Sequence, residues 1–595
     1  MALQPHAVPG CQQRATNLLR HFFAILTVLV GSLWLVPLAR RRLAVNGLAD
    51  PAAVAVGMGA SLGSLSLWML VLGLLPGAWL LPVLVLPVPW LGLALQILPG
   101  WRGAPRARPA RVQPLALLCA GTLLVIAINT LSYPFYRYDV LARFAPNARQ
   151  LFEAAHIPAS LTGYPLAVQL QYTFAFMAAG AVNDHYAGVI VAAYAVALAL
   201  ATFAVARAAF NARAAWCALL LLLSAPLFVD WATAGYVDVP VALYHALALL
   251  FALRWLHSGA RADALGAGIC AGLGILTKHS ALVLLPAVAA VPLLRNRSRT
   301  DFANAALALL AALALAGPWY ARNLLLAGWG GVLPAPGAYD AQALDTSIAT
   351  LLTFWSDRAE WGAPFSIAAT GGLLLGAAQL LYPRLNPAVP NARQRILLFA
   401  AFILPYQLLW WQGFSYQTRY LLASAPMFAA IGGYGIDWLL QRMPALARLP
   451  QPAVLGLAAG LLALGAYGRL GAVYHLALHP LQSDADKLAR LSPGLWPLAQ
   501  RMRATLPAGS RLYTMEGALA YWLPEYPYQY GFPVALADLR GFDYLVVSPI
   551  GESVYAFGGT LNNEVLSALG DPLLLPLQFE QADGSAVYAV GAGLR

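Results

Sequence analysis

The sequence has few charged residues: they make up 10% of its 595 residues, against roughly a quarter in a typical soluble protein. Hydrophobic residues make up 60% and occur in repeated apolar runs. Many of these runs approach the roughly 20 residues that a helix needs to cross the hydrocarbon of a bilayer. The composition therefore excludes a soluble globular protein and predicts a polytopic membrane protein.

Several familiar catalytic motifs are also absent. The chain contains no G-x-x-x-x-G-K-[ST] phosphate loop and no H-E-x-x-H zinc helix. Its four cysteines form no C-x-x-C pair or disulfide framework, and its nine histidines are scattered. ATP-driven and zinc-protease chemistry therefore have no motif to support them. In a membrane protein, the net charge of +12 bears on topology and lipid headgroups rather than on nucleic acid.

Basic residues between the apolar runs set the expected orientation. Four arginines lie between residues 102 and 111, and the positive-inside rule places such a cluster in the cytoplasm. The helix expected at 114–131 then runs outward and delivers the chain from Ser132 onward to the external face. Continued along the sequence, this alternation of apolar runs and basic loops predicts 13 or 14 transmembrane helices.

The fold class expected is an all-α polytopic membrane protein with a small C-terminal α/β domain. We expect extra N-terminal transmembrane helices at 1–112, a catalytic membrane core at 113–470 and a periplasmic domain at 471–595. The core would carry two external loops, 132–185 and 321–362. Strand-like runs mark the last domain, at Arg511–Met515, at Tyr544–Ser548 and in a hairpin, Leu577–Val590, turning at Asp583-Gly584.

A polar, aromatic-rich stretch, Ser132–Asn147, follows the first outward helix of this core. It carries a single carboxylate, Asp139, with Arg137, Tyr138 and Arg143 close by in sequence. We interpret it as an active-site loop with Asp139 as the catalytic residue and these three neighbours as its support. Further along the same external segment, the amphipathic stretch Tyr164–Met177 is expected to lie on or dip into the membrane.

Two more carboxylates, Asp230 and Asp238, bracket a short external turn on the face predicted for Asp139. Each has an ordinary structural explanation, as a turn residue or as a favourable charge at a helix N-terminus. Alternatively, one of them orients the acceptor or serves as a second acid, or the three share a divalent cation. The sequence shows no required cofactor, and it leaves the metal unknown.

Cations separated widely in sequence are predicted on the same face. The apolar stretch Leu265–Leu294 would measure about 45 Å as one helix, which is too long for the bilayer, so we expect a turn at Lys278-His279. Two further external cations follow, Arg322 and Arg419. Each of these residues can anchor a helix end at the interface. Together they predict a binding site for the phosphate of a membrane-held ligand.

These segments resemble the GT-C superfamily of membrane glycosyltransferases, which includes the protein O-mannosyltransferases and the aminoarabinose transferase of lipid A. The resemblance runs over roughly 130–440, in the family order, through YDVLARFAPNARQLFEAAHIP (138–158), YPLAVQLQYTFAF (164–176), YVDVPVALYHALALLFALRW (236–255), AGLGILTKHSALVLLP (271–286), GPWYARN (317–323) and TRYLLASAPMFA (418–429). Many members carry an Asp-Glu pair in the first loop, whereas this chain has Asp139-Val140. It thus resembles the single-acid branch.

The resemblance implies a bacterial inner-membrane enzyme whose active site and C-terminal domain face the periplasm. Its donor would be a hexose or pentose linked to polyprenyl phosphate, and its acceptor a lipid, glycan or protein of the cell envelope. We expect Asp139 to act as general base in an inverting transfer. Two alternatives stay open: a transporter or flippase for a lipid-linked or anionic solute, and a polysaccharide ligase or polymerase.

Overall fold

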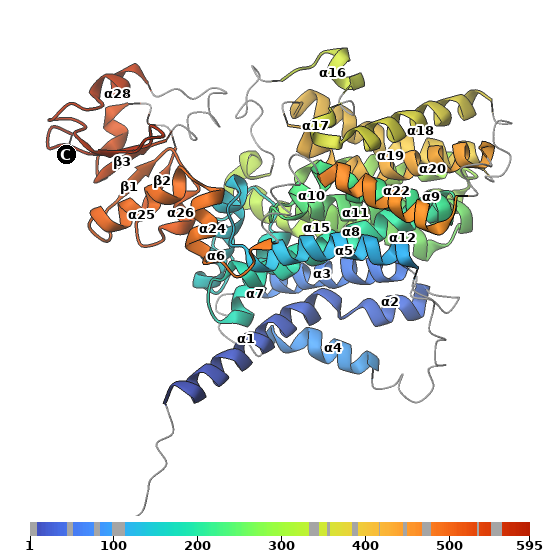
Figure 1. Ribbon diagram of the computed structural model, residues 1–595, viewed down its shortest axis with the longest axis horizontal. Helices are drawn as coiled ribbons and strands as arrows, with labels where there is room; N and C mark the ends of the chain where they lie inside the picture. The colour runs from blue at the N-terminus through green and yellow to red at the C-terminus, as the bar shows by residue number, and fades with distance from the viewer. Residues whose placement is uncertain are drawn as a thin grey trace, which may run out of the picture.

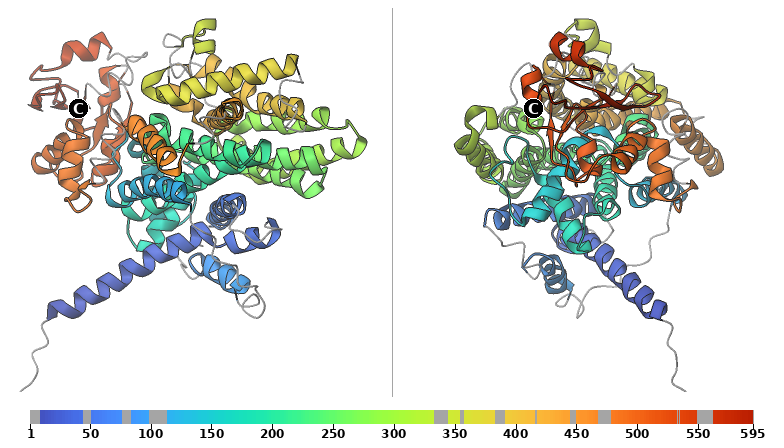
Figure 2. Two further views of the ribbon diagram at one scale, coloured as in Figure 1. Left: turned by 45° about the vertical axis from the view of Figure 1, so that its right-hand side comes forward. Right: turned by 90° about the vertical axis from the view of Figure 1, so that its left-hand side faces the viewer.

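The computed structural model describes residues 9–43, 51–75, 84–97, 113–332, 344–353, 357–382, 391–415, 417–443, 449–466, 478–531, 533, 535–548 and 562–594. In these ranges the chain forms a bundle of long helices with a small C-terminal domain at one end (Figures 1 and 2). The predicted fold class, an all-α membrane protein with a small C-terminal α/β domain, is confirmed. The arginine cluster at 102–111 lies outside the described residues.

The first half of the bundle contains most of its central helices. They are α1 (Pro9–Leu33), α2 (Val36–Leu43), α3 (Pro51–Gly73), α4 (Pro87–Ile97), α5 (Pro114–Ser132), α6 (Ala145–Ala154), α7 (Ala167–Ala179), α8 (Asp184–Ala209), α9 (Ala212–Ser224), α10 (Pro226–Ala232), α11 (Asp238–Ser258) and α12 (Arg261–Thr277).

The second half continues with α13 (Leu284–Ala289), α14 (Val291–Leu294), α15 (Arg299–Ala327), α16 (Ile348–Thr353), α17 (Arg358–Trp361), α18 (Ala363–Leu381), α19 (Ala392–Gly413), α20 (Ala425–Arg442) and α22 (Gln451–Ala466). Short π or 3₁₀ turns interrupt the chain at η4 (Val140–Phe144), η5 (His279–Val283), η6 (Gly328–Gly331) and η9 (Thr418–Ser424).

Eight helices in the described part of the chain are long and apolar enough to cross a bilayer, or nine if the bent pair α9 and α10 is one span. The other segments predicted to span correspond to helices that are shorter or less apolar, namely α4, α12, α13 with α14, α20 and α22. The turn predicted at Lys278-His279 is confirmed, because α12 ends at Thr277 and η5 begins at His279.

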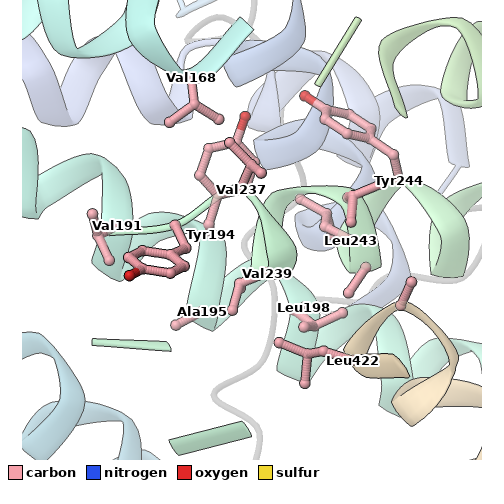
Figure 3. Packing of buried hydrophobic residues seen from close by; sticks show 14 of the residues in the cluster. Val168, Val191, Tyr194, Ala195, Leu198, Val237, Val239, Leu243, Tyr244 and Leu422 are labelled. Carbon is pink, nitrogen blue, oxygen red and sulfur yellow. The ribbon is translucent and has the colours of Figure 1, made fainter. Parts of the chain in front are cut away.

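The core of the bundle lies around α8 and α11. The apolar part of each helix is 83% buried inside the protein, against 28% for α5 and 33% for α15, which lie farther out. Side chains from α7, α8, α11 and η9 interlock there, with Tyr194, Leu243 and Leu422 among them (Figure 3). The central helices therefore form a rigid frame whose ends position the polar loops.

One prediction for the core region is wrong. The stretch Tyr164–Met177 contains most of α7 and was expected to lie on or dip into the membrane as an amphipathic helix with one exposed side. Every residue from Ala167 to Phe176 is buried, and the helix packs against α3, α6 and α1. Its polar side chains face other helices: the Gln171 amide, for example, donates to the Tyr194 hydroxyl at 2.8 Å. In the sequence alone, polar residues that hydrogen-bond to other helices give the same pattern as the solvent-facing side of an amphipathic helix.

The C-terminal domain combines helices α24 (Asp484–Leu491), α25 (Leu495–Thr505), α26 (Leu519–Trp522) and α28 (Asn563–Ala568) and the turn η10 (Leu536–Leu539) with strands β1 (Leu512–Thr514), β2 (Tyr528–Tyr530), β3 (Tyr544–Val547), β4 (Leu577–Glu580) and β5 (Ala586–Ala589). The sheet has the order β2-β1-β3-β5-β4; β1 is parallel to β2 and β3, and the other pairs are antiparallel. The predicted hairpin is confirmed as β4 and β5, whereas β2 was not predicted.

This domain is fixed to the bundle by polar contacts at the external loop. The buried Tyr521 hydroxyl donates to Asp184 at the start of α8, and a guanidinium N–H of Arg149 in α6 donates to the Tyr521 carbonyl at 2.7 Å. Lys487 donates to the Ser132 carbonyl at the end of α5. The C-terminal domain therefore contacts the segment Ser132–Asn147 directly.

Two glycines allow α12 and α15 to approach closely. A Cβ on Gly268 would lie 2.1 Å from the Ala308 carbonyl oxygen, and one on Gly272 would lie 2.8 Å from that of Ala312. Small residues four positions apart form the typical close contact between membrane helices. Since backbone atoms block the added carbon, the helices must separate if either glycine is replaced.

We predict that Gly268→Ala lowers stability by about 1–3 kcal/mol, as overpacking of a helix contact does. Thermal unfolding in detergent measures the change. Gly317→Ala is the matched control, since a Cβ there meets nothing within 4 Å and alanine favours a helix. Equal melting temperatures for Gly268→Ala and the control would contradict the packing.

A second prediction concerns Glu516, a fully buried carboxyl in the C-terminal domain that accepts from the Ala518 N–H at 2.9 Å. Burial raises its pKa from 4.5 to about 7. Between these values the unfolded chain releases a proton that the folded protein keeps, so the free energy of unfolding falls as pH rises. The loss amounts to about 3 kcal/mol and is complete above pH of about 7.

Glu516→Gln should therefore flatten the pH dependence of the melting temperature between about pH 4.5 and 7. The exposed Glu564 of α28 supplies the control Glu564→Gln, which should keep the wild-type profile. If the profile of Glu516→Gln also matches that of wild type, the carboxyl does not titrate in this range.

Candidate active site

Asp139 is positioned by two contacts from distant parts of the chain. Its backbone N–H donates to the Tyr236 hydroxyl at 2.7 Å, just before the π turn η4. Its carboxylate pairs with the Arg419 guanidinium at 2.7 Å. The side chain of Asp139 is 35% exposed, whereas that of Arg419 is 11% exposed. Asp139 is therefore a carboxylate open to a ligand and held by a mostly buried cation.

Lys278 and Asp238 form a second, deeper pair. Lys278 follows the last turn of α12 with an extended backbone, which directs its side chain away from that helix. Its ammonium lies 2.6 Å from the carboxylate of Asp238 in the first turn of α11. The two side chains are only 10% and 4% exposed. Because an unpaired buried charge costs several kcal/mol, each residue stabilises the charge of the other.

Arg137 and Asp230 form a third pair at the edge of the same region. The guanidinium of Arg137, in the first external loop, contacts the carboxylate of Asp230 in α10. It also lies 5.3 Å from the ring centre of Tyr136 and 5.5 Å from that of Trp231. This pair fastens the loop to α10, and the carboxylate of Asp230 is committed to a residue other than Lys278 or Arg419.

Aromatic rings join the three cations into one continuous arrangement, which we call the cation–aromatic row. Its members in spatial order are Arg137, Trp231, Arg419, Tyr420 and Lys278. The guanidinium of Arg419 lies 5.1 Å from the Trp231 ring and 4.9 Å from the Tyr420 ring, and the Lys278 ammonium lies 4.1 Å from the Tyr420 ring. Cation–π attraction favours these positions and spaces the like charges apart.

The row is brought together by the turn between α10 and α11. Gly235 adopts φ +73°, and a Cβ there would lie 2.8 Å from the ring of Phe135 in the first loop. The turn therefore needs glycine for both its backbone angle and its close approach. It places Trp231, Tyr236 and Asp238 on one side. Sequence reasoning missed Trp231, Tyr236 and Tyr420 as site residues, although two of them lie between Asp230 and Asp238.

Arg143 and His279 lie in a neighbouring aromatic cluster. Arg143 lies 5.2 Å from the ring centre of Tyr164, and the ring of His279 lies 5.7 Å from the same tyrosine. The His279 ring nitrogen Nδ1 is 2.9 Å from the Tyr320 hydroxyl of α15. His279 therefore follows Lys278 in sequence, but its side chain contacts Tyr164 and Tyr320 rather than the Asp238 carboxylate.

Arg322 has a different set of partners from the other predicted phosphate ligands. Its guanidinium donates to the carbonyls of Leu161 and Pro158 at 2.8 and 2.7 Å, and it lies 5.1 Å from the Trp319 ring. These contacts tie α15 to the far part of the first external loop. The structure thus brings Lys278 and Arg419 together, while Arg322 braces the loop elsewhere.

The carboxylates do not gather into a metal site within the described ranges. No group of three His, Cys, Asp or Glu side chains there could hold a metal ion. Asp139, Asp230 and Asp238 instead each pair with a different cation. The proposal that the three acids share a divalent ion gains no support from this arrangement.

The C-terminal domain forms one wall beside Asp139. The hydroxyl of Tyr138 lies 3.3 Å from that of Tyr530 at the end of β2. Burial, with the nearby carboxyl of Glu516, raises the pKa of Tyr138. A Cβ on Gly517 would lie 3.2 Å from the side chain of Ala142 in η4. This domain therefore contacts the first loop at Tyr138, just before Asp139, and at Ala142, three residues after it.

Comparisons with known proteins agree with this architecture. The sequence profile of the dolichyl-phosphate-mannose-protein mannosyltransferase family matches residues 165–321. The comparison with curated proteins found no match. The fold is similar to that of ArnT from Cupriavidus metallidurans bound to undecaprenyl phosphate, with a TM-score of 0.57, 17% identity, and coverage of 82% of this chain and 99% of that one.

The apo state of the same ArnT gives a TM-score of 0.56 at 17% identity, over 81% of this chain and 98% of that one. An oligosaccharyltransferase from Archaeoglobus fulgidus in the apo form gives a TM-score of 0.48 at 13% identity, over 81% of this chain and 75% of that one. The matched segment 165–321 includes Asp230, Asp238 and Lys278. The similarity to ArnT shows that this chain shares the fold of that protein over 82% of its own length.

Proposed function

We propose that this protein transfers a sugar from a polyprenyl-phosphate-linked donor to an acceptor hydroxyl of the cell envelope, on the periplasmic face of a bacterial inner membrane. The observation that carries the proposal is the meeting of Asp139, Arg419 and Lys278 around Tyr236 and Tyr420. A solvent-accessible carboxylate next to two buried cations matches the two needs of the reaction, a base and a phosphate site.

The donor phosphate would bind at Lys278 and Arg419. The structure of ArnT with undecaprenyl phosphate supports a donor of this class. Each of the two cations pairs with a carboxylate, so an incoming phosphate must compete with one of these carboxylates. Asp139 is 35% exposed and Asp238 only 4%. The phosphate therefore displaces Asp139 from Arg419, while Asp238 keeps Lys278 in place.

Asp139, once released, can act as the general base. The acceptor oxygen attacks the anomeric carbon, and its proton moves to the Asp139 carboxylate. The bond between that carbon and the phosphate oxygen breaks, and Lys278 and Arg419 stabilise the negative charge left on the polyprenyl phosphate. Attack opposite to the leaving phosphate inverts the anomeric configuration. The reaction uses one accessible acid, which fits a first loop that carries Asp139-Val140 in place of an acidic pair.

The arrangement favours this reaction over the other two functions. A transporter for an anionic solute usually carries its charges near the middle of the membrane, between inverted helical repeats. Here Asp139, Asp238, Lys278 and Arg419 all lie at the ends of helices or short turns, and Tyr138, next to Asp139, contacts the C-terminal domain. A ligase or polymerase would use the same donor chemistry with a larger glycan, so only the product can separate it from a transferase of single hexoses or pentoses.

The first test replaces the proposed base. Asp139→Asn should lower transfer of a radiolabelled sugar from a polyprenyl-phosphate donor to envelope acceptors by about 10²–10⁴-fold, the usual contribution of a general base. Donor binding should be retained or tightened, because the asparagine competes less strongly for Arg419. The control Glu153→Gln removes an exposed carboxylate from the same external segment and should transfer at the wild-type rate. Wild-type turnover by Asp139→Asn would rule out its role as base.

The second test separates the phosphate site from the loop brace. Lys278→Gln should raise the donor Kd by about tenfold or more, since it removes a charged contact to phosphate. Arg322→Gln should leave the donor Kd within about threefold of wild type, which is under 1 kcal/mol. Binding of a labelled polyprenyl phosphate to protein in nanodiscs measures both. If Arg322→Gln raised the donor Kd strongly and Lys278→Gln left it unchanged, the phosphate would bind near Arg322 rather than near Lys278.

A further inference from the structure

The C-terminal domain presents an uncharged aromatic edge next to the proposed base. β2 forms one edge of the five-stranded sheet and pairs only with β1. Its three residues are Tyr528, Gln529 and Tyr530, and all three are exposed. The two tyrosines are 45% and 39% exposed. Large aromatic side chains left at a strand edge next to an active site need a function.

The geometry of the strand aligns the two tyrosines with the first external loop. Alternate residues of a strand point to the same face and lie about 6.6 Å apart, so Tyr528 lies on the side of Tyr530. The Tyr530 hydroxyl is 3.3 Å from that of Tyr138, the residue before Asp139. Tyr138, Tyr530 and Tyr528 therefore form a row that leads away from Asp139, which we call the tyrosine row.

The position of this row is fixed by the contact between domain and loop. A Cβ on Gly517 would lie 3.4 Å from the Tyr530 ring and 3.2 Å from Ala142, so ring, glycine and loop are packed together. The side chain of Gln529 bonds to the Tyr513 hydroxyl, which holds β2 on its neighbour. The Tyr521 contact to Asp184 anchors the segment between β1 and β2. A ligand on the row would therefore be held in register with Asp139.

We propose that the tyrosine row binds the acceptor, and that the acceptor is an uncharged carbohydrate chain. This rests on the proposed function and names its acceptor class. A pyranose ring has an apolar C–H face that packs on an aromatic ring, and hydroxyls that bond to phenol groups. The row supplies both. β2 carries no charged side chain, whereas a phosphorylated or acidic headgroup would call for a lysine or arginine free to bind it. The guanidinium of Arg149, near Tyr528, already donates to the Tyr521 carbonyl and lies 4.6 Å from the Tyr521 ring.

The test measures glycan binding by the full-length protein in detergent, using an array of neutral oligosaccharides and, in parallel, extended peptides. Wild type should bind one class of neutral oligosaccharide. The double variant Tyr528→Ala, Tyr530→Ala should bind it about tenfold more weakly, as expected for lost aromatic packing. Tyr528→Phe should lose less binding than the double variant, because it keeps both rings and removes a single hydroxyl. Leu577→Ala, at the exposed opposite edge strand β4, is the control and should also bind normally.

Three results would overturn the proposal: no neutral oligosaccharide binds, binding survives in the double variant, or peptides bind instead and are lost in Gln529→Pro. The last result would identify β2 as an edge for strand addition. In transfer assays with an accepted glycan, the double variant should raise the acceptor KM by about tenfold, with little change in kcat or in the donor KM. If glycans bind but no sugar is transferred from any polyprenyl phosphate, the proposed function fails while the binding surface stands.

Discussion

The site depends on the electrostatic cost of placing charges where apolar helices end. Two ion pairs offset that cost, because each buried charge alone would cost several kcal/mol. Asp139 pairs with Arg419, and Asp238 pairs with Lys278. The four residues come from the first loop, α11, the end of α12 and η9, so pairing them fixes the relative positions of these segments. Trp231 and Tyr420 lie between the cations and complete the row.

The same pairing provides a means of coupling donor binding to catalysis. While Asp139 pairs with Arg419, its Oδ2 atom contacts the guanidinium and is not available to an acceptor hydroxyl. A phosphate that takes over Arg419 would free Asp139 only when the donor is in place. In the proposed mechanism the deeper pair, Lys278 with Asp238, would stay assembled and hold the phosphate. Acceptor activation would then follow donor binding, which limits loss of the sugar to water.

Much of this arrangement could be predicted from the sequence, and the rest depends on long-range contacts. The length of the apolar stretch Leu265–Leu294 was enough to place the turn at Lys278. The strand-like run Leu577–Val590, with its turn at Asp583-Gly584, was enough to locate the hairpin of β4 and β5. Which cation pairs with which acid could not be read, because the partners lie 40 to 280 residues apart in the chain. Arg322 illustrates this: its motif suggested a phosphate ligand, whereas its hydrogen bonds hold two loop carbonyls. Strand β2, with three residues, was too short to recognise.

The most direct test is a structure of the protein in nanodiscs with a polyprenyl phosphate bound. Our account predicts the phosphate oxygens within hydrogen-bonding distance of both the Lys278 ammonium and the Arg419 guanidinium. It also predicts that the Asp139 carboxylate leaves Arg419 and opens toward Tyr138, while Asp238 keeps its contact to Lys278. A phosphate bound at Arg322, or anywhere that leaves the contact between Asp139 and Arg419 intact, would contradict the account.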